Sequence, residues 1–222
     1  WYRSRGLGDV YKRQEKDINV EINDFVEKKN IVSLFPGSRD SEIKILFPVL
    51  INFIKKMNLK DNSYHYIFHS TQKFKEMIKS KLLAEKLSNV EVVSDDKIKS
   101  QVLKKSIFAI VKSGTVSLDV CKNNIPSMII YKMNFFNYHL AKFLLKIKYV
   151  NMINIINNKE IIPELLQNEC NPNEIYKTFY YFMKKPNLIK EQMSVVKNTI
   201  DDLKSSTSAS DQASKVILSY LT

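Results

Sequence analysis

Apolar residues along the chain follow two alternating patterns. Short runs rich in β-branched and aromatic residues alternate with longer segments in which apolar positions recur every three or four residues. The short runs predict strands at 31–35, 64–69, 90–93, 107–112 and 126–131, with a further candidate at 149–153, and the longer segments predict helices at 40–58, 71–87, 96–105, 115–123 and 135–148. Alternation of strand and helix implies parallel strands joined by right-handed crossovers, so we expect a doubly wound α/β sheet.

The pattern changes after about residue 160. Segments with helical spacing follow one another at 160–168, 173–184, 187–204 and 208–221, separated by Pro172, Pro186 and a Ser/Thr run at 205–208. We therefore expect the strands to end before this point and the chain to finish as a helical tail.

The first residues differ in composition from the rest of the chain. Residues 1–14 contain the only tryptophan, three of the four arginines and two of the four glycines. The chain does not begin with Met, and this stretch resembles translated sequencing-adaptor sequence. We therefore set it aside as non-native, assign 15–222 to one domain, and expect Trp1 to stay outside the core. A genuine basic arm is the alternative.

The charge of the chain is positive but dispersed. The net charge of +12 falls to +9 without residues 1–14, since 31 basic and 22 acidic residues remain. The remaining basic residues are all lysines except Arg39, and they form no arginine-rich or aromatic reading element. We therefore expect no nucleic-acid partner, and at most a surface that weakly attracts anionic lipid or nucleotide.

Several classes of site and location are excluded by composition. No stretch approaches the roughly 18–20 apolar residues that span a bilayer, and no signal peptide is visible, so we expect a cytoplasmic protein. Cys121 and Cys170 lie in no metal-ligand spacing and are too few for a disulfide framework. His65 and His69 lie four residues apart on a predicted strand, and we interpret them as packing residues. We expect neither a metal nor another cofactor.

Glycine is rare outside the first segment, where only Gly37 and Gly114 remain. Each directly follows a predicted strand and opens a helix, in LFPGSRDSE at 34–42 and VKSGTVSLD at 111–119. Glycine permits a positive φ and a close backbone approach, and a helix N-terminus supplies free N–H donors and a partial positive charge. Each turn is therefore a candidate phosphate site.

The order of the two turns in the chain predicts that they lie together. Gly37 follows the first strand and Gly114 the fourth, and in the common 3-2-1-4-5 strand order these strands are neighbours. We therefore expect both loops to face one crevice at the carboxyl edge of the sheet. Arg39 lies in the first loop and suits bidentate phosphate contact, with a surface arginine that binds no ligand as the alternative.

These motifs together resemble those of the lipid-A-disaccharide synthases. Residues 36–39 (PGSR) and Glu42 look like the LLPGSR…E motif of that family, and 113–118 (SGTVSL) resemble its ASGT…LE segment. Its YR, KYV, N and RE(V/I)PELLQ stretches are matched in order by 131–132, 148–150, Asn154 and 159–167. The PGSR motif alone is not specific for this family, but a PELLQ segment that follows the other motifs in this order is specific. The resemblance covers about residues 30–172.

The resemblance implies a Rossmann-like sheet that is the C-terminal domain of a GT-B glycosyltransferase, an enzyme of two such domains facing a cleft. The family transfers diacylglucosamine from UDP-2,3-diacylglucosamine to 2,3-diacylglucosamine 1-phosphate, and forms lipid A disaccharide 1-phosphate and UDP. The C-terminal domain binds the UDP donor, whereas the missing N-terminal domain would supply the lipid acceptor site and the catalytic base. We therefore expect no catalytic residue in this chain.

The resemblance also assigns roles to single residues. Ser38 and Arg39, with the N–H groups around Gly114, would hold the diphosphate and stabilise charge on the departing UDP. Asp119 stands where the family has a ribose-binding Glu, and Lys132 replaces an Arg and loses bidentate contact. Residues assigned to the UDP-sugar site are Gly37, Ser38, Arg39, Ser113, Gly114, Thr115, Asp119, Lys132, Asn154 and Glu160. For the last two, helix capping and ordinary solvated polarity are the alternative.

One segment has the pattern of a membrane-surface helix. Residues 135–150 (FFNYHLAKFLLKIKYV) combine an apolar helical face with lysines, and packing on the sheet is the alternative. Because the family's substrates are lipids, the resemblance implies peripheral contact with the inner membrane. Two other function classes stay open, namely another sugar-nucleotide enzyme (a lipid-linked N-acetylglucosaminyltransferase or an epimerase) and a non-enzymatic nucleotide-binding module.

Overall fold

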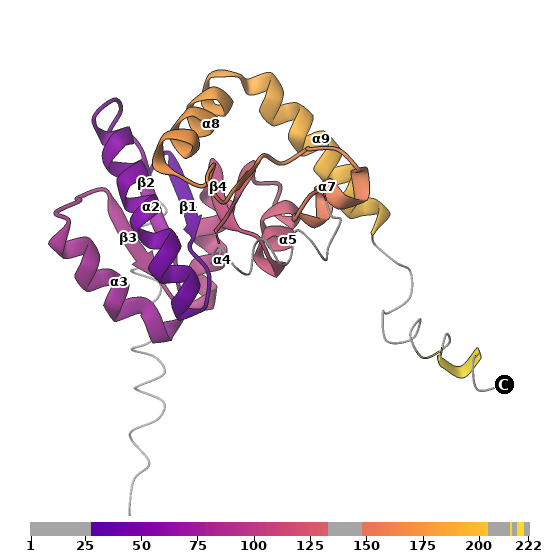
Figure 1. Cartoon of the computed structure of the whole chain (residues 1–222), viewed down its shortest axis with the longest axis horizontal. Helices are drawn as coiled ribbons and strands as arrows, with labels where there is room; N and C mark the ends of the chain where they lie inside the picture. The colour runs from indigo at the N-terminus through magenta and orange to yellow at the C-terminus, as the bar shows by residue number, and fades with distance from the viewer. Residues whose placement is uncertain (1–27, 133–147, 204–213, 215–216, 220–222) are drawn as a thin grey trace, which may run out of the picture.

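Six parallel strands form the central sheet of the protein (Figure 1). The computed structural model describes residues 28–132, 148–203, 214 and 217–219. Its strands are β1 (Ile31–Phe35), β2 (His65–His69), β3 (Val90–Val93), β4 (Phe108–Lys112), β5 (Ser127–Tyr131) and β6 (Glu164–Leu166). They lie in the order β3-β2-β1-β4-β5-β6, and every neighbouring pair is parallel. The predicted doubly wound sheet and the adjacency of its first and fourth strands are confirmed.

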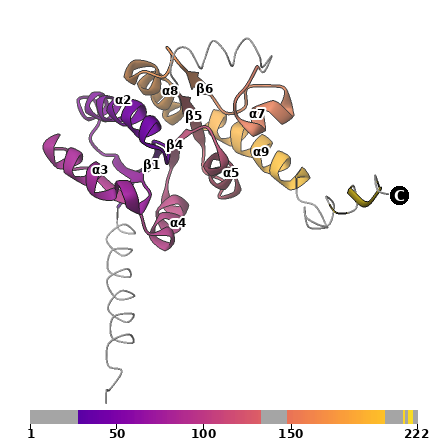
Figure 2. The same cartoon turned by 60° about the horizontal axis from the view of Figure 1, so that its bottom comes forward.

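Helices cover both faces of this sheet, as the two views in Figures 1 and 2 show. They are α2 (Asp40–Asn58), α3 (Gln72–Ala84), α4 (Asp96–Lys105), α5 (Thr115–Lys122), α7 (Met152–Asn157), α8 (Pro172–Lys184) and α9 (Pro186–Asp202). One layer of the core joins α2, α3 and α8 to the sheet, and the other face packs against α4, α5, α7 and α9. The predicted helical tail is present as α8 and α9.

The core explains why the strands were visible in the sequence. On β4, Phe108 and Ile110 belong to the first core layer, whereas Ala109 and Val111 belong to the second, and all four are fully buried. Because a parallel sheet with helices on both faces buries both sides of each strand, such strands are continuous apolar runs.

Two sequence-based predictions are wrong. A helix was predicted for 160–168, but residues 164–166 form the edge strand β6, which pairs with β5. Residues 164–166 are a strand because they form hydrogen bonds with the open edge of β5. The spacing of apolar residues within 160–168 contains no information about this pairing. The strand candidate at 149–153 is also wrong, because Asn151 accepts a hydrogen bond from the N–H of Ile153 and so begins α7.

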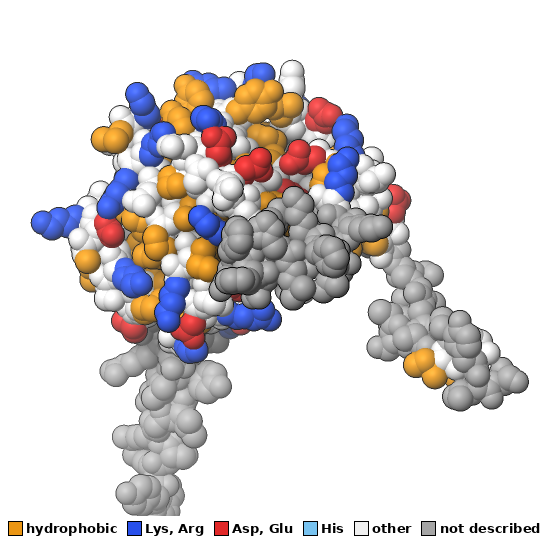
Figure 3. All heavy atoms as spheres, in the orientation of Figure 1, with side chains coloured by type: hydrophobic (Ala, Val, Ile, Leu, Met, Phe, Trp, Pro, Cys, Tyr) orange, Lys and Arg blue, Asp and Glu red, His pale blue; other side chains and the backbone are white. Residues whose placement is uncertain are grey.

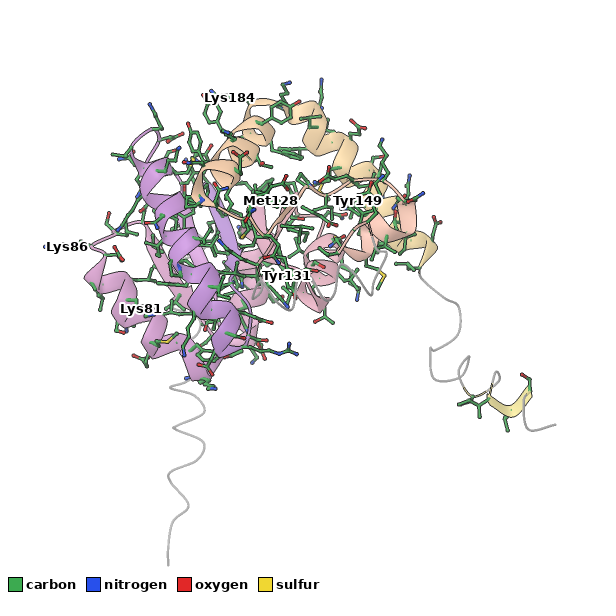
Figure 4. The ribbon with its side chains drawn as sticks, in the orientation of Figure 1. Lys81, Lys86, Met128, Tyr131, Tyr149 and Lys184 are labelled. Atoms are coloured by element: carbon green, nitrogen blue, oxygen red, sulfur yellow. The ribbon has the colours of Figure 1, made fainter. Side chains whose placement is uncertain are left out.

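Other expectations fall outside the described residues. These are the expectation that residues 1–14 are non-native, the position of Trp1, most of the proposed surface helix at 135–150 and most of the predicted helix at 208–221. Within the described ranges, no helix is both long enough and apolar enough to cross a bilayer. Lysines on the face shown in Figure 3 are interspersed with acidic and apolar side chains, and Lys86 and Lys184 in Figure 4 point outward at the ends of α3 and α8.

Candidate functional site

A cavity of about 380 Å³ opens at the carboxyl edge of the sheet. Its walls come from the segments that follow β1, β2 and β4, together with one residue of α4. The predicted residues Gly37, Ser38, Arg39, Ser113, Gly114 and Thr115 all line it. The sequence-based expectation that both glycine turns face one crevice is therefore confirmed in its geometry.

The first turn is shaped around the side chain of Glu42. The N–H of Ser38 donates to Glu42 Oε2 at 3.0 Å. Arg39, in an extended conformation, is the N-cap residue that precedes α2. Gly37 has a φ of 106°, a conformation that favours glycine. A Cβ at Gly37 would lie 2.7 Å from the Cβ of Glu42, so the packing of this carboxylate beneath the loop also requires glycine.

Glu42 is held as a carboxylate at the base of the cavity. Burial raises the pKa of its carboxyl, but hydrogen bonds from Lys112 Nζ and from the N–H of Ser38 outweigh burial and keep the pKa below its usual value. Lys112 Nζ lies 3.0 Å from Glu42 Oε1 and 5.4 Å from the ring centre of Tyr131, which is labelled in Figure 4. The lysine is thereby fixed at the end of β4, beside the second turn.

The charge balance of the cavity favours an anion. Its charged lining residues are the cations Arg39, Lys99 and Lys112 and the single carboxylate Glu42, which leaves two net positive charges. Arg39 Nη1 lies 3.7 Å from Glu42 Oε1, and the arginine side chain is 79% exposed. Because the guanidinium is exposed and lies at the far limit of an ion pair from the largely buried carboxylate, the pair contributes little, and the guanidinium can turn towards a ligand at small cost.

The second turn presents the start of α5 to the cavity. Gly114 is the N-cap residue, with φ 152° and ψ −168°. Thr115 and Val116 line the cavity, and their N–H groups belong to the first turn of the helix, which has no intrahelical acceptors. The hydroxyl of Ser113 donates to the carbonyl of Val150 at 3.0 Å, so this hydroxyl is engaged in positioning the loop.

Asp119 and Lys132 do not line the cavity. Asp119 is exposed on α5, four residues after Thr115 and hence on the same helix face. Lys132 directly follows β5 at the carboxyl edge of the sheet. Lys132 therefore lies at the edge to which the cavity opens and Asp119 one helical turn along α5 from it, and ribose or sugar contacts by both stay predictions.

Asn154 organises the protein interior. Its side chain is fully buried, and its Oδ1 accepts from the N–H groups of Ile161 and Ile162 at 2.8 and 2.9 Å. Its Nδ2 donates to the carbonyl of Ile162 at 2.7 Å and to Glu164 Oε1 at 2.8 Å. A side-chain amide has two donor hydrogens and two acceptor lone pairs, so the hydrogen-bonding capacity of Asn154 is filled within the protein.

Glu160 lies at the opposite edge of the sheet from the cavity. It precedes β6, and the amino ends of parallel strands share the edge opposite to their carboxyl ends. It is exposed, and its Oε1 accepts from the N–H of Glu164 at 3.1 Å. Glu160 thus has the exposed polarity that was the alternative for it, whereas Asn154 is neither a helix cap nor solvated but a buried hydrogen-bonding residue. Contacts of either residue with the nucleotide or the sugar stay predictions.

His69 and Lys112 are among the lining residues that sequence analysis did not assign to the site. His69, interpreted as a packing residue, lies at the carboxyl end of β2 with its ring stacked on Phe35 at 4.2 Å between centroids. Burial, with a smaller effect of Lys99, lowers the pKa of His69 to about 3. Lys112 ends β4 two residues before Gly114. The available signal was position, because polar residues at the carboxyl ends of neighbouring strands meet at one edge.

Metal and thiol chemistry find little support in the described part of the chain. Within it, no group of three or more His, Cys, Asp or Glu side chains lies close enough together to hold a metal ion. Both cysteines are free and buried, and burial raises the thiol pKa of Cys121 to about 12 and of Cys170 to about 11. These thiols are therefore protonated at neutral pH and inert as nucleophiles.

Replacing Gly37 by alanine is expected to lower the free energy of unfolding by about 2–3 kcal/mol, because a strained φ adds to the steric conflict with Glu42. Gly114→Ala is the matched control, since its φ of +152° is also unfavourable but the nearest atom to its Cβ is Lys112 Nζ at 3.9 Å. Urea denaturation measures both. An equal loss for the two variants would show that the packing of Glu42 does not require Gly37.

Solved structures with the same fold define the class of protein. The C-terminal domain of a glycosyl transferase group 1 family protein from Francisella tularensis has a TM-score of 0.55 at 9% identity, over 85% of this chain and 93% of that one. Escherichia coli ADP-heptose LPS heptosyltransferase II gives 0.53 at 10% identity, over 80% and 52%. At these identities the likeness shows the fold alone, which is that of the C-terminal domain of a GT-B glycosyltransferase.

Sequence comparison then gives the family. The model of the lipid-A-disaccharide synthetase family matches residues 6–217. The lipid-A-disaccharide synthase of Persephonella marina is 32% identical over 206 residues, which are 91% of this chain and 53% of that protein. The Rickettsia bellii synthase is 31% identical over 211 residues, or 94% and 53%. The chain belongs to the lipid-A-disaccharide synthetase family and spans about half the length of these curated relatives. The family match begins inside the segment 1–14 that sequence analysis set aside.

Proposed function

We propose that this chain binds the UDP part of UDP-2,3-diacylglucosamine in the cavity between the turns after β1 and β4. One observation carries the proposal: two glycine turns that suit phosphate, far apart in sequence, border one cavity with an excess of two positive charges. The chain would form the donor half of a lipid-A-disaccharide synthase. That enzyme transfers diacylglucosamine to 2,3-diacylglucosamine 1-phosphate, and forms lipid A disaccharide 1-phosphate and UDP.

Each part of the cavity has a role in this proposal. The N–H groups at the start of α5 and the Arg39 guanidinium would contact the diphosphate, with Lys112 behind them. Negative charge grows on these phosphates as the sugar leaves, so contacts that strengthen with that charge lower the barrier to transfer. Asp119 and Lys132 would meet the ribose and the sugar outside the cavity.

The lipid acceptor and the contact with the inner membrane are part of the same proposal. They are supported by the family, whose substrates are lipids, and by the interfacial pattern of residues 135–150. An epimerase is less well supported, because the UDP-GlcNAc 2-epimerase of Neisseria meningitidis is similar in fold alone, at 9% identity and a TM-score of 0.52, whereas the family model that matches this chain is that of the lipid-A-disaccharide synthetases.

UDP is expected to bind the chain, and Arg39→Ala to weaken that binding about ten- to a hundredfold, since a charge-assisted hydrogen bond contributes about 1.5–3 kcal/mol. Isothermal titration calorimetry measures the affinity. Lys44→Ala on the exposed face of α2 is the matched control, because it removes one positive charge outside the cavity. Equal affinities of the Arg39 and Lys44 variants would remove Arg39 from the site, and a chain that binds no UDP would refute the proposal.

A further inference from the structure

A chain of buried hydrogen bonds runs behind the cavity and ends at His69. Ser33 Oγ lies 2.7 Å from His69 Nε2 and 2.7 Å from Ser106 Oγ. Ser106 Oγ in turn donates to the carbonyl of Val102 at 2.9 Å. The three side chains are at most 7% exposed and come from β2, β1 and the end of α4.

Only one arrangement of protons makes all three contacts in this chain hydrogen bonds. A carbonyl only accepts, so the single hydroxyl hydrogen of Ser106 points to Val102. The hydroxyl of Ser33 must then donate to Ser106, which leaves Ser33 only its lone pair for His69. His69 Nε2 is therefore the protonated nitrogen. The ring is neutral at physiological pH because burial lowers its pKa to about 3, so Nδ1 carries a free lone pair.

His69 lines the cavity, and Nδ1 is its ring nitrogen without a hydrogen bond to a described residue. Among the described residues, Tyr66 Oη is the only fully buried side-chain polar atom without a hydrogen-bond partner. No described protein group donates to Nδ1, so Nδ1 keeps contact with solvent, and His69 reaches solvent through the cavity that it lines. Phe35, stacked on the ring, fixes its plane. The cavity thus contains a fixed acceptor that matches a ligand N–H or O–H.

The position of His69 indicates which part of a nucleotide it meets. The phosphate turns follow β1 and β4, and β2 lies on the far side of β1, about 5 Å further along the sheet. The cavity wall there consists of Phe35, His69, Ser70 and Thr71, all uncharged at neutral pH. Lys99 is the one charged residue at this end, and its pairing with the exposed Asp96 at 2.6 Å offsets part of its charge. An uncharged, flat, hydrogen-bonding group suits this end better than a phosphate.

We propose that His69 Nδ1 accepts a hydrogen bond from the imide N–H of uracil, and that this contact makes the site select UDP over CDP. The inference rests on the proposed function, because it places the base of the same donor nucleotide. Uracil N3 carries a hydrogen, whereas cytosine N3 carries a lone pair that would face the lone pair of Nδ1. Ser33 is a positioning residue, since its hydrogen bond fixes the tautomer that makes Nδ1 an acceptor.

Titration of the full chain with UDP and CDP tests the proposal. UDP is expected to bind at least about tenfold more tightly than CDP, as a buried acceptor left without a donor is costly. His69→Phe retains an aromatic ring but removes Nδ1. Ser33→Ala retains His69 but removes the hydrogen bond that fixes which ring nitrogen is protonated. Both variants should therefore bring the affinities for UDP and CDP closer together. Nitrogen-15 NMR of the unliganded chain should show a protonated Nε2 and an unprotonated Nδ1, which does not depend on either variant folding.

Each other outcome has a definite meaning. Equal UDP and CDP affinities, or a protonated Nδ1, would overturn the inference while the proposed function stands. If His69→Phe weakens UDP binding and the replacement of UDP by 2′-deoxy-UDP weakens it by the same factor, Nδ1 accepts from a ribose hydroxyl. That result would also overturn the inference. Binding of neither diphosphate would instead refute the proposed function.

Discussion

The chain on its own is expected to bind UDP but to form no disaccharide from UDP-diacylglucosamine and diacylglucosamine 1-phosphate. Glycosyl transfer requires a base that removes the proton of the acceptor hydroxyl, and a second surface that aligns this hydroxyl with the anomeric carbon. In the GT-B arrangement that surface belongs to the other domain, and the chain spans 53% of the Persephonella marina synthase.

The described cavity offers no suitable base. A general base is most effective when its pKa lies near the working pH. Hydrogen bonds from Lys112 and Ser38 keep the pKa of Glu42 below its usual value despite its burial, and Glu42 is already an acceptor for both groups. His69 has a pKa of about 3, and its Nε2 is engaged by Ser33. Neither residue is suited to take up a proton at neutral pH.

The expected loss of rate is large. Positioning of two reactants contributes roughly 7–11 kcal/mol to a bimolecular reaction, which corresponds to about five to eight orders of magnitude in rate. Mass spectrometry would measure disaccharide formed by the chain alone and by the chain fused in frame to the N-terminal half of the Persephonella marina synthase. UDP titration of both preparations controls for folding. Turnover by the chain alone would place the chemistry within it.

The sheet was predictable because its information is local. Buried parallel strands are continuous apolar runs, and two scarce glycines mark the turns after β1 and β4. The strand β6 was not predictable in this way, since three residues carry little pattern and pairing with β5 decides their conformation. The hydrogen-bond chain from His69 to Ser106 joins three elements that lie far apart in sequence. Local patterns do not contain such a contact.

The residue roles that were transferred by resemblance differ in the same way between local and long-range features. The turn residues around Gly37 and Gly114 line the cavity, because a motif that shapes the backbone fixes its own geometry. Asn154 was assigned to the nucleotide from its place in a motif, yet its side chain connects α7 to β6 and to the two isoleucines at 161 and 162. A motif shows that a residue type belongs at a position. It does not distinguish a ligand contact from a buried hydrogen-bond hub.

Replacing Asn154 by aspartate is therefore expected to lower the free energy of unfolding by about 3–5 kcal/mol, the range for a buried charge left uncompensated. An oxygen would replace Nδ2, which now donates to Glu164 Oε1 at 2.8 Å and to the carbonyl of Ile162 at 2.7 Å. Glu164 is itself buried and accepts from the N–H groups of Val150 and Asn151. Two carboxylates would meet in the interior without a counter-ion between them.

Asn154→Ala separates the two roles assigned to this residue. If Asn154 is a hub, alanine leaves two N–H groups, one carbonyl and one carboxylate oxygen without this partner, and should cost about 2–4 kcal/mol. UDP affinity of the folded variant should then change less than about twofold. Glu160→Gln, an exposed change in the same loop, is the control and should shift stability by less than about 0.5 kcal/mol. A stable Asn154→Ala variant with weakened UDP binding would return Asn154 to the nucleotide site, because only a ligand contact loses affinity without loosening the fold.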